Sequence, residues 1–437
     1  LPRVKGCKKG DIIESWASVN GPAIFARSYP AHMHINIKPG YQHCGIGTRL
    51  FAALTEHLRE IGCKGVMLVV DSYNTNAIKF YKKTSSISYS LCASAQSWRA
   101  GSEKAGKNMK LAVIGTGWIV KSFIDGLKFA PDFELFAVYS RSRERGEKFA
   151  KENGISTVYT SLDELAASPA ECVYIASPNA LHYTQSKKML ESGKHVICEK
   201  PITVTPDEFS ELCEIADKNK LIYIEAIMYM HSPVRAALRE ALGDIGKVWT
   251  AHFDFSQYSS KYPAYLRGEL PNIFNPAMAT GSLMDLGIYC VYPAIDLFGE
   301  PETVSAVSAF LESGADAATA VSMLCKNTAI TMTSCKTGQD HAGSQIIGER
   351  GSIKIGSISK LTDIELVMND GTSRVICGDT PKDELMGNEA RAFYELITEP
   401  ENNREKYREL RETALSVSRT MQRIRESAGI KFDGGIA

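Results

Sequence analysis

Three polar residues of this chain have the types and the spacing for proton-transfer chemistry. Lys200 follows a short apolar run and precedes a proline, and a lysine buried at a strand end must find a partner or lose its proton. Asp285 and Tyr289 are spaced i, i+4, so a helix would place both side chains on one face. A free tyrosine titrates at about 10, and a nearby cation such as Lys200 would lower that pKa.

A second candidate site is a glycine turn in residues 110–120, KLAVIGTGWIV. A short apolar run, a Gly-Thr-Gly turn and a possible helix start form the pattern of a dinucleotide-binding βαβ unit. Gly115 would allow the tight turn, and Gly117 would let the backbone approach a pyrophosphate at the helix N–H groups. Val120 stands where the third glycine is usual. The expected phosphate-binding residues are Gly115, Thr116, Gly117, Trp118 and Ile119.

The segments after this turn predict a doubly wound α/β domain. Strands are expected near residues 110–115, 134–139, 172–177, 194–198 and 221–225, with helical stretches between them. Such alternation is typical of a parallel sheet with helices on both faces.

The end of the second expected strand bears on the cofactor. NAD enzymes usually place an acidic side chain here for the ribose 2′-hydroxyl, whereas arginine accommodates a 2′-phosphate. This chain has Ser140 at the place of the acid and Arg141 beside it. The sequence therefore favours NADP(H), with NAD(H) possible. The structural alternative is a solvated basic loop.

Beyond residue 228 the pattern changes. Alternating runs at 248–255, 304–310, 318–325 and 329–334 predict a mostly antiparallel open sheet that helices cover on one face. Residues 404–430 predict a charged packing helix. A polar and aromatic segment around Tyr258 predicts either the lining of a sugar pocket or a surface loop.

Two further motifs carry a specific resemblance. P-N-x-x-H at residues 178–182 and G-K-H-V-x-x-E-K-P at residues 193–201 resemble the hallmark pair of the Gfo/Idh/MocA oxidoreductases. The similarity extends over about residues 109–427. It implies that Lys200 faces the nicotinamide and the substrate, and that the C-terminal sheet mediates oligomerisation. It also implies cofactor-site roles for Ser177, Asn179, His182, Glu199 and Lys200. For His182 the alternative is a helix-start histidine bonded to backbone, and Glu199 would mainly shape the turn.

Most of that family has D-x-x-x-H where this chain has Asp285 and Tyr289. The tyrosine is similar to the branch with glucose-fructose oxidoreductase, pyranose dehydrogenases and trans-dihydrodiol dehydrogenase. The resemblance implies that Tyr289 is the acid/base, that Lys200 is its electrostatic partner and that Asp285 orients the lysine or a substrate hydroxyl. Substrate contacts are expected from Tyr258, Asp285 and Tyr289. The structural alternative for Tyr289 is a core tyrosine.

The first hundred residues carry a different pattern. A strand at 32–37 precedes a Q-x-x-G-x-G loop, and a strand at 66–70 precedes an N-x-A-x-x-F-Y helix. This order resembles the second half of a GNAT acetyltransferase over residues 28–83. The resemblance implies that acetyl-CoA, if the segment is active, is bound by Gln42, Gly45 and Gly47, with Tyr81 as general acid. The alternative is a relic of such a domain.

Composition excludes several classes of protein. The 437 residues include 50 Lys plus Arg and 50 Asp plus Glu, so no basic field favours nucleic acid or an anionic membrane. No apolar run approaches the roughly 18 residues of a membrane span. The eleven cysteines are scattered without zinc spacing, as is typical of thiols in a reducing cytoplasm.

Together these features predict an α/β chain with a Rossmann domain and a C-terminal α+β domain. The expected segments are a partial GNAT-like segment (1–88), a linker (89–108), the NADP-binding domain (109–227), the substrate and oligomerisation domain (228–430) and a tail (431–437). We expect a dimeric or tetrameric NAD(P)-dependent oxidoreductase that needs no metal and acts on a sugar, cyclitol or trans-dihydrodiol. The alternatives are a bifunctional N-acetyltransferase–oxidoreductase and a non-catalytic NADP- or sugar-binding regulator.

Overall fold

The computed structural model describes residues 31–33, 66–69, 90–93, 96–97 and 108–432. The chain divides into two compact units, Leu1–Ala105 and Gly106–Ala437. The described part of the first unit is a four-stranded sheet with parallel pairing except between its last two strands. Its strands, in sheet order, are β1 (Ala31–Met33), β2 (Val66–Val69), β3 (Ser90–Ala93) and β4 (Gln96–Ser97).

Strands β3 and β4 lie within residues 89–108, which we expected to be a linker. Leu91 and Cys92 of β3 pair in register with Leu68 and Val69 of β2. Pairing with a distant strand outweighs the weak local pattern of this segment. The expected acetyl-CoA residues Gln42, Gly45, Gly47 and Tyr81 lie outside the described residues.

The second unit begins with a six-stranded sheet in the order β10-β9-β8-β5-β6-β7, in which every neighbouring pair is parallel. This is the predicted doubly wound sheet, with one short strand, β7, that the sequence did not predict. The order reverses between β5 and β8, which is the place where such folds bind ligands. The strands are β5 (Met109–Ile114), β6 (Phe133–Tyr139), β7 (Thr157–Tyr159), β8 (Cys172–Ile175), β9 (His195–Glu199) and β10 (Tyr223–Ala226).

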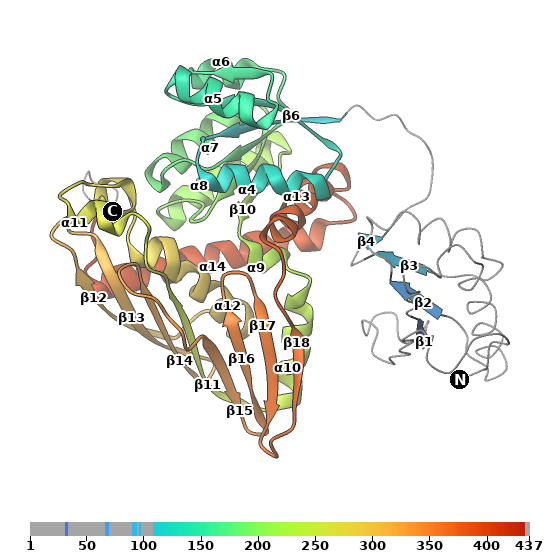
Figure 1. The fold of residues 1–437 in the computed structure, drawn as a ribbon, viewed down its shortest axis with the longest axis vertical. Coiled ribbons are helices and arrows are strands. Elements are labelled where there is room, and N and C mark those ends of the chain that lie inside the picture. The colour runs from blue at the N-terminus through green and yellow to red at the C-terminus, as the bar shows by residue number, and fades with distance from the viewer. Residues whose placement is uncertain (1–30, 34–65, 70–89, 94–95, 98–107, 433–437) are drawn as a thin grey trace, which may run out of the picture. The chain divides into compact units, whose positions relative to one another are not determined.

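Helices connect these strands and cover the sheet (Figure 1). The last of them begins with a capping box, in which Thr205 and Glu208 each bond the other's backbone N–H. Four consecutive fully buried residues, 111–114, explain why β5 lies at the centre of the sheet. The connecting helices are α4 (Trp118–Gly126), α5 (Arg143–Asn153), α6 (Leu162–Ala167), α7 (His182–Glu191) and α8 (Pro206–Asn219).

A second sheet of eight strands follows in the order β12-β13-β14-β11-β15-β16-β17-β18. Only the β11–β14 pair is parallel, so the predicted mostly antiparallel open sheet is confirmed. Its strands are β11 (Val248–Ser256), β12 (Thr303–Phe310), β13 (Asp316–Cys325), β14 (Thr328–Cys335), β15 (Ser344–Gly348), β16 (Gly351–Ser357), β17 (Thr362–Met368) and β18 (Ser373–Cys377).

Helices pack on one face of this sheet and also join it to the parallel sheet (Figure 1). Helix α14 contacts both β12 and α8, and its buried Leu410, Val417 and Ile424 confirm the predicted packing helix. Helix α13 approaches α4 closely, as a Cβ on Gly126 of α4 would lie 2.7 Å from the backbone nitrogen of Gly387. The helices of this part are α9 (Met228–His231), α10 (Val234–Ile245), α11 (Tyr262–Leu266), α12 (Ile288–Phe298), α13 (Lys382–Thr398) and α14 (Arg404–Ala428).

Among the described residues, no helix has the length and apolar character needed to cross a membrane.

Candidate active site

The glycine turn between β5 and α4 has the backbone shape that a bound phosphate needs. Gly115 has a φ of 115°, and a Cβ there would lie 2.7 Å from the carbonyl oxygen of Ala176, so a side chain does not fit. Gly117 is the N-cap of α4, and a Cβ on it would meet only open space. The first N–H groups of α4 have no side-chain cap, which suits a pyrophosphate. Val120, in place of the third glycine, is fully buried.

Trp118 and Ile119 open helix α4 beside this turn. The Trp118 side chain is 71% exposed, and the Lys382 ammonium lies 3.9 Å from its ring centre. Lys382 begins α13, so the C-terminal part of the chain reaches the edge of the expected cofactor site.

Ser140 and Arg141 lie directly after β6, as predicted. The Ser140 hydroxyl is buried and donates to the carbonyl oxygen of Ser142 at 2.9 Å, which stabilises the turn into α5. Arg141 is exposed. An exposed guanidinium at this strand end, with Ser140 in place of an acidic residue, suits a ribose 2′-phosphate.

The P-N-x-x-H motif forms the turn after β8. The Asn179 amide donates to the carbonyl oxygen of Ala279 at 2.8 Å, which ties this turn to the C-terminal part. His182 is fully buried, and its ring nitrogens lie 2.8 Å from the carbonyl oxygens of Pro201 and Ser177. Burial lowers the pKa of His182. This geometry matches the structural alternative for His182, a histidine bonded to backbone.

Glu199 supports the turn that carries Lys200. Its carboxylate is buried and accepts a hydrogen bond of 2.6 Å from the Tyr174 hydroxyl. Burial raises the pKa of Glu199, and the charge of Lys200 opposes that shift. The peptide bond between Lys200 and Pro201 is cis.

Lys200, Asp285 and Tyr289 come together, although Lys200 directly follows β9 and the other two lie about 85 residues further along the chain, in one continuous helical stretch. The Lys200 ammonium donates to the backbone oxygen of Asp285 at 2.9 Å and to its Oδ1 at 3.0 Å. It also lies 4.9 Å from the ring centre of Tyr289. Asp285 lies in a π-helical turn (Leu283–Gly287) that leads directly into α12, where Tyr289 is the second residue. The predicted single helical face is therefore interrupted by a wider turn.

The pKa of Tyr289 corrects an expectation. We expected a nearby lysine to bring the pKa below that of a free tyrosine. Burial instead raises it to about 12, with Lys200 acting in the opposite direction. The Phe255 ring packs edge-on against Tyr289, with ring centres 5.2 Å apart, so desolvation outweighs the single cation.

Sequence reasoning missed Lys336, a second lysine in this cluster. Its ammonium forms an ion pair with Oδ2 of Asp285, and its side chain is 4% exposed. Burial, followed by the charge of Lys200, lowers the pKa of Lys336 to about 7. A signal existed, because Ile330, Met332 and Ser334 of β14 are buried on alternate positions. The same alternation places Lys336 on the inner face.

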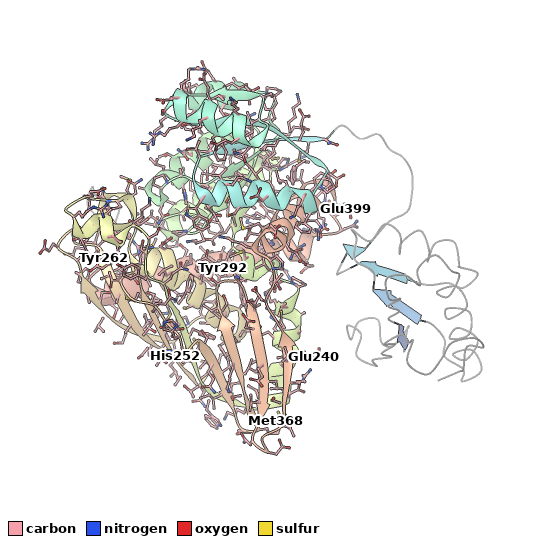
Figure 2. The ribbon with its side chains drawn as sticks, in the orientation of Figure 1. Glu240, His252, Tyr262, Tyr292, Met368 and Glu399 are labelled. Atoms are coloured by element: carbon pink, nitrogen blue, oxygen red, sulfur yellow. The ribbon has the colours of Figure 1, made fainter. Side chains whose placement is uncertain are left out.

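Tyr258, expected to contact substrate, lies in the loop after β11. Its side chain is 46% exposed, and its ring packs edge-on against Tyr262 at 5.8 Å. Tyr262 in turn stacks on Tyr265 and contacts Phe274. Figure 2 shows Tyr262 at the α11 end of the second sheet. The loop is joined to the cluster, because the Ser259 N–H donates to the carbonyl oxygen of Lys336 at 2.9 Å.

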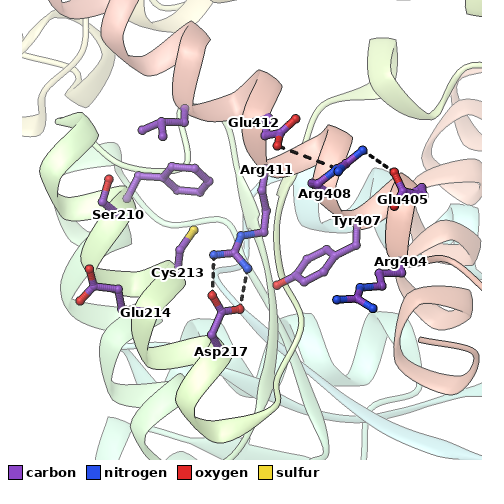
Figure 3. Close-up of a pocket in the computed structure, with 12 residues that line it drawn as sticks. Ser210, Cys213, Glu214, Asp217, Arg404, Glu405, Tyr407, Arg408, Arg411 and Glu412 are labelled. Atoms are coloured by element: carbon purple, nitrogen blue, oxygen red, sulfur yellow. Dashed lines mark hydrogen bonds and ion pairs between the residues drawn. The ribbon is translucent and has the colours of Figure 1, made fainter. Parts of the chain in front are cut away.

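A groove between α8 and α14 shows no comparable cluster (Figure 3). Arg411 forms two hydrogen bonds with Asp217, and Arg408 forms ion pairs with Glu405 and Glu412. Carboxylates of the protein already bind both arginine side chains, so these arginines do not indicate an anion site.

Comparisons with known proteins agree with this architecture. The Gfo/Idh/MocA oxidoreductase family, with an NAD-binding Rossmann fold, matches residues 109–227, and the C-terminal domain of that family matches residues 234–354. The acetyltransferase (GNAT) family matches residues 19–85.

Relatives of known name match the same part of the chain. The scyllo-inositol 2-dehydrogenase (NADP(+)) IolU of Bacillus subtilis is 36% identical over 325 residues, which are 74% of this chain and 98% of that protein. The mouse trans-1,2-dihydrobenzene-1,2-diol dehydrogenase is 34% identical over 215 residues, 48% of this chain and 62% of the mouse enzyme.

Solved structures share the fold at low identity. The 3-ketoreductase KijD10 of Actinomadura kijaniata, in complex with NADP and TDP-benzene, superposes with a TM-score of 0.65 at 19% identity, covering 73% of this chain and 98% of that one. Levoglucosan dehydrogenase, in complex with NADH and levoglucosan, gives a TM-score of 0.63 at 19% identity, covering 74% and 97%. With both family domains matched in order and a relative aligned over nearly its whole length, the chain belongs to the Gfo/Idh/MocA family of oxidoreductases.

Proposed function

We propose that this protein is an NADP(H)-dependent oxidoreductase that interconverts a carbinol and a carbonyl in a small polyhydroxylated ring. The observation that carries the proposal is the position of the Lys200 ammonium, fixed by two hydrogen bonds to Asp285 and 4.9 Å from the ring centre of Tyr289. A lysine held beside a partly buried phenol supplies a proton donor and a positive charge at one point.

The glycine turn fits the cofactor. Gly115 and Gly117 leave room where the pyrophosphate would approach the N-terminus of α4. The bound nicotinamide would supply or accept the hydride. Ser140 and Arg141 favour the 2′-phosphate of NADP(H), and the name of the inositol dehydrogenase relative includes NADP(+).

Tyr289 would exchange a proton with the substrate oxygen. With a pKa of about 12 the phenol is protonated at neutral pH, so it is ready to donate to a carbonyl oxygen. Lys200 would polarise that oxygen and favour the phenolate when the reaction runs toward the carbonyl. Asp285 would orient Lys200, because both its backbone oxygen and its Oδ1 accept from the ammonium.

The substrates named for the relatives favour a cyclic substrate that carries several oxygen atoms. Their names specify scyllo-inositol, a trans-dihydrodiol and levoglucosan. The exposed aromatic ring of Tyr258 near the cluster suits the apolar face of such a ring.

The test is reduction of NADP+ and NAD+, followed by absorbance, across pyranoses, cyclitols and dihydrodiols. We expect activity with at least one cyclic polyol and preference for NADP+. A purified, folded protein that binds NADPH and is inactive throughout the panel in both directions would refute the proposed substrate class.

We also propose that the uncovered face of the second sheet joins copies of this chain into a dimer or tetramer. Three apolar side chains from separate strands of that face, Val307, Ile347 and Val375, are 70%, 43% and 73% exposed. Light scattering of the full chain would test this. A monomer at micromolar concentration would contradict it.

A further inference from the structure

Lys336 has hydrogen-bonding capacity that the protein does not use. An ammonium group carries three N–H donors. Among the described residues, Oδ2 of Asp285 is the only acceptor that bonds the Lys336 ammonium. The side chain is 4% exposed, so bulk water offers little compensation, and a buried donor without an acceptor is costly.

The unused N–H donors of Lys336 lie beside Lys200, close to the place where the reacting oxygen of the substrate would bind. Lys200 bonds Oδ1 of Asp285 and Lys336 bonds Oδ2, so one carboxylate holds both ammonium groups side by side. Lys200 is the group beside Tyr289. A ligand oxygen bonded to Lys336 would therefore be a close neighbour of the oxygen that exchanges its proton with Tyr289.

The backbone of Lys336 connects the cluster with the expected substrate loop. Its carbonyl oxygen accepts from the Ser259 N–H at 2.9 Å, and Gln257 bonds the preceding carbonyl, that of Cys335, at 2.8 Å. Tyr258 lies between these two bonded residues. Lys336 is thus at the junction of the loop and the Lys200–Asp285–Tyr289 cluster.

We propose that Lys336 is a substrate-binding residue that donates to the oxygen on the carbon next to the reacting carbon. The substrate class is then a vicinal diol in one direction and an α-hydroxy ketone in the other. This inference rests on the proposed function and narrows it, because a mono-alcohol would leave the Lys336 donors without an acceptor. Each carboxylate oxygen of Asp285 already accepts from one lysine, whereas Lys336 has donors that no described acceptor uses.

The protonation state of Lys336 does not weaken this role. With a pKa lowered to about 7, the group exists as ammonium and amine near neutrality, and both forms donate hydrogen bonds. The ion pair with Asp285 also favours the ammonium.

The experiment compares matched probes in the full-length protein. The pairs are trans-cyclohexane-1,2-diol with cyclohexanol, and trans-cyclopentane-1,2-diol with cyclopentanol, each tested for NADP+ reduction. For a pair that the wild type oxidises, we expect the adjacent hydroxyl to raise kcat/KM by about tenfold to a hundredfold. Lys336→Met should remove most of that ratio, while Lys336→Arg should keep part of it.

The control is Lys218→Met, which removes an exposed lysine of α8 and should leave the ratio unchanged. Lys336→Met leaves Asp285 paired with Lys200, and NADPH fluorescence would establish that the variant is folded. Lys336→Gln provides a second variant that can still donate.

The outcomes separate the two proposals. If Lys336→Met lowers kcat/KM equally for both members of a pair, Lys336 only positions Asp285 and this inference is wrong. If the wild type oxidises mono-alcohols as well as diols, the inference is also wrong although the oxidoreductase proposal stands. If the wild type oxidises none of the probes and no member of the wider polyol panel, the proposed function fails and this inference fails with it.

Discussion

The Lys200 ammonium lies 4.9 Å from the ring centre of Tyr289, yet the pKa of this tyrosine is raised to about 12. The two facts are compatible because Asp285 bonds Lys200 and offsets part of its charge, and because the surrounding protein desolvates the partly buried phenol. The resting site therefore holds a neutral phenol beside a paired lysine, and the tyrosine is a stronger candidate for proton donation than for proton acceptance at neutral pH.

Replacing Tyr289 with phenylalanine should reduce turnover by more than tenfold, because only the group that exchanges the proton is removed. NADPH affinity should stay nearly unchanged, since the phosphate turn lies on β5 and α4. Steady-state kinetics and NADPH fluorescence titration would measure both. Tyr394→Phe is the matched control, because that tyrosine lies on α13 and its ring packs edge-on against Phe133 of β6. Retention of more than about a tenth of the activity in Tyr289→Phe would exclude the acid/base role.

The pH dependence should differ between the two directions of the reaction. Alcohol oxidation needs a form of Tyr289 that accepts a proton, so its kcat/KM should rise with pH from about 7 to about 10. Carbonyl reduction needs the phenol, which persists until the pH approaches 12. Lys200→Met should move the rise in oxidation to higher pH, because the positive charge that favours the phenolate is lost. An oxidation rate that falls as pH increases would contradict this assignment.

The sequence predicts the parts of the site that depend on local pattern. The turn at Gly115 follows from the motif, and the structure gives this glycine a φ of 115°. The contact of Lys200 with Asp285 was expected only from the family resemblance, and the structure places the Lys200 ammonium 3.0 Å from Oδ1 of Asp285. The sequence could not predict the pKa of Tyr289, because that value depends on desolvation by residues distant in the chain, such as Phe255 of β11. Lys336 was missed because its place in the site depends on its ion pair with Asp285, fifty-one positions away. The alternating pattern of a strand shows which side chains are buried, but it does not show which residues they contact.

A buried carboxylate near the site should make stability depend on pH. Burial raises the pKa of Glu225 from 4.5 to about 7, although the Tyr292 hydroxyl and the Ile202 N–H both donate to it. Between these two pH values the unfolded chain releases the proton and the folded protein keeps it. The free energy of unfolding should therefore fall as pH rises through this window, by up to about 3 kcal/mol, and level off above it.

Glu225→Gln should remove this dependence, because the amide can still accept from Ile202 and donate to the Tyr292 oxygen. Urea unfolding at about pH 5 and about pH 8 would show a smaller difference for the variant than for the wild type. Glu240→Gln, on the exposed side of α10, should behave like the wild type. Equal pH dependence in Glu225→Gln and wild type would mean that another group causes it.

Cofactor choice can be tested at Arg141 with a neighbouring arginine as control. Arg141 is exposed directly after Ser140, where a 2′-phosphate would lie, whereas Arg143 pairs with Glu147 at 3.6 Å on α5. Arg141→Ala should raise the KM for NADP+ by about tenfold, since a hydrogen bond between charged groups contributes roughly 1.5–3 kcal/mol and an exposed one falls at the lower end. The KM for NAD+ should not change, because NAD+ lacks the phosphate.

Arg143→Ala should leave both constants near wild type, which separates a specific contact from a general loss of positive charge. The double change Ser140→Asp and Arg141→Ala should go further and favour NAD+, because the new carboxylate accepts from the ribose hydroxyls and repels a 2′-phosphate. If NAD+ is already preferred by the wild type, the strand-end argument from Ser140 and Arg141 is wrong, whatever the substrate is.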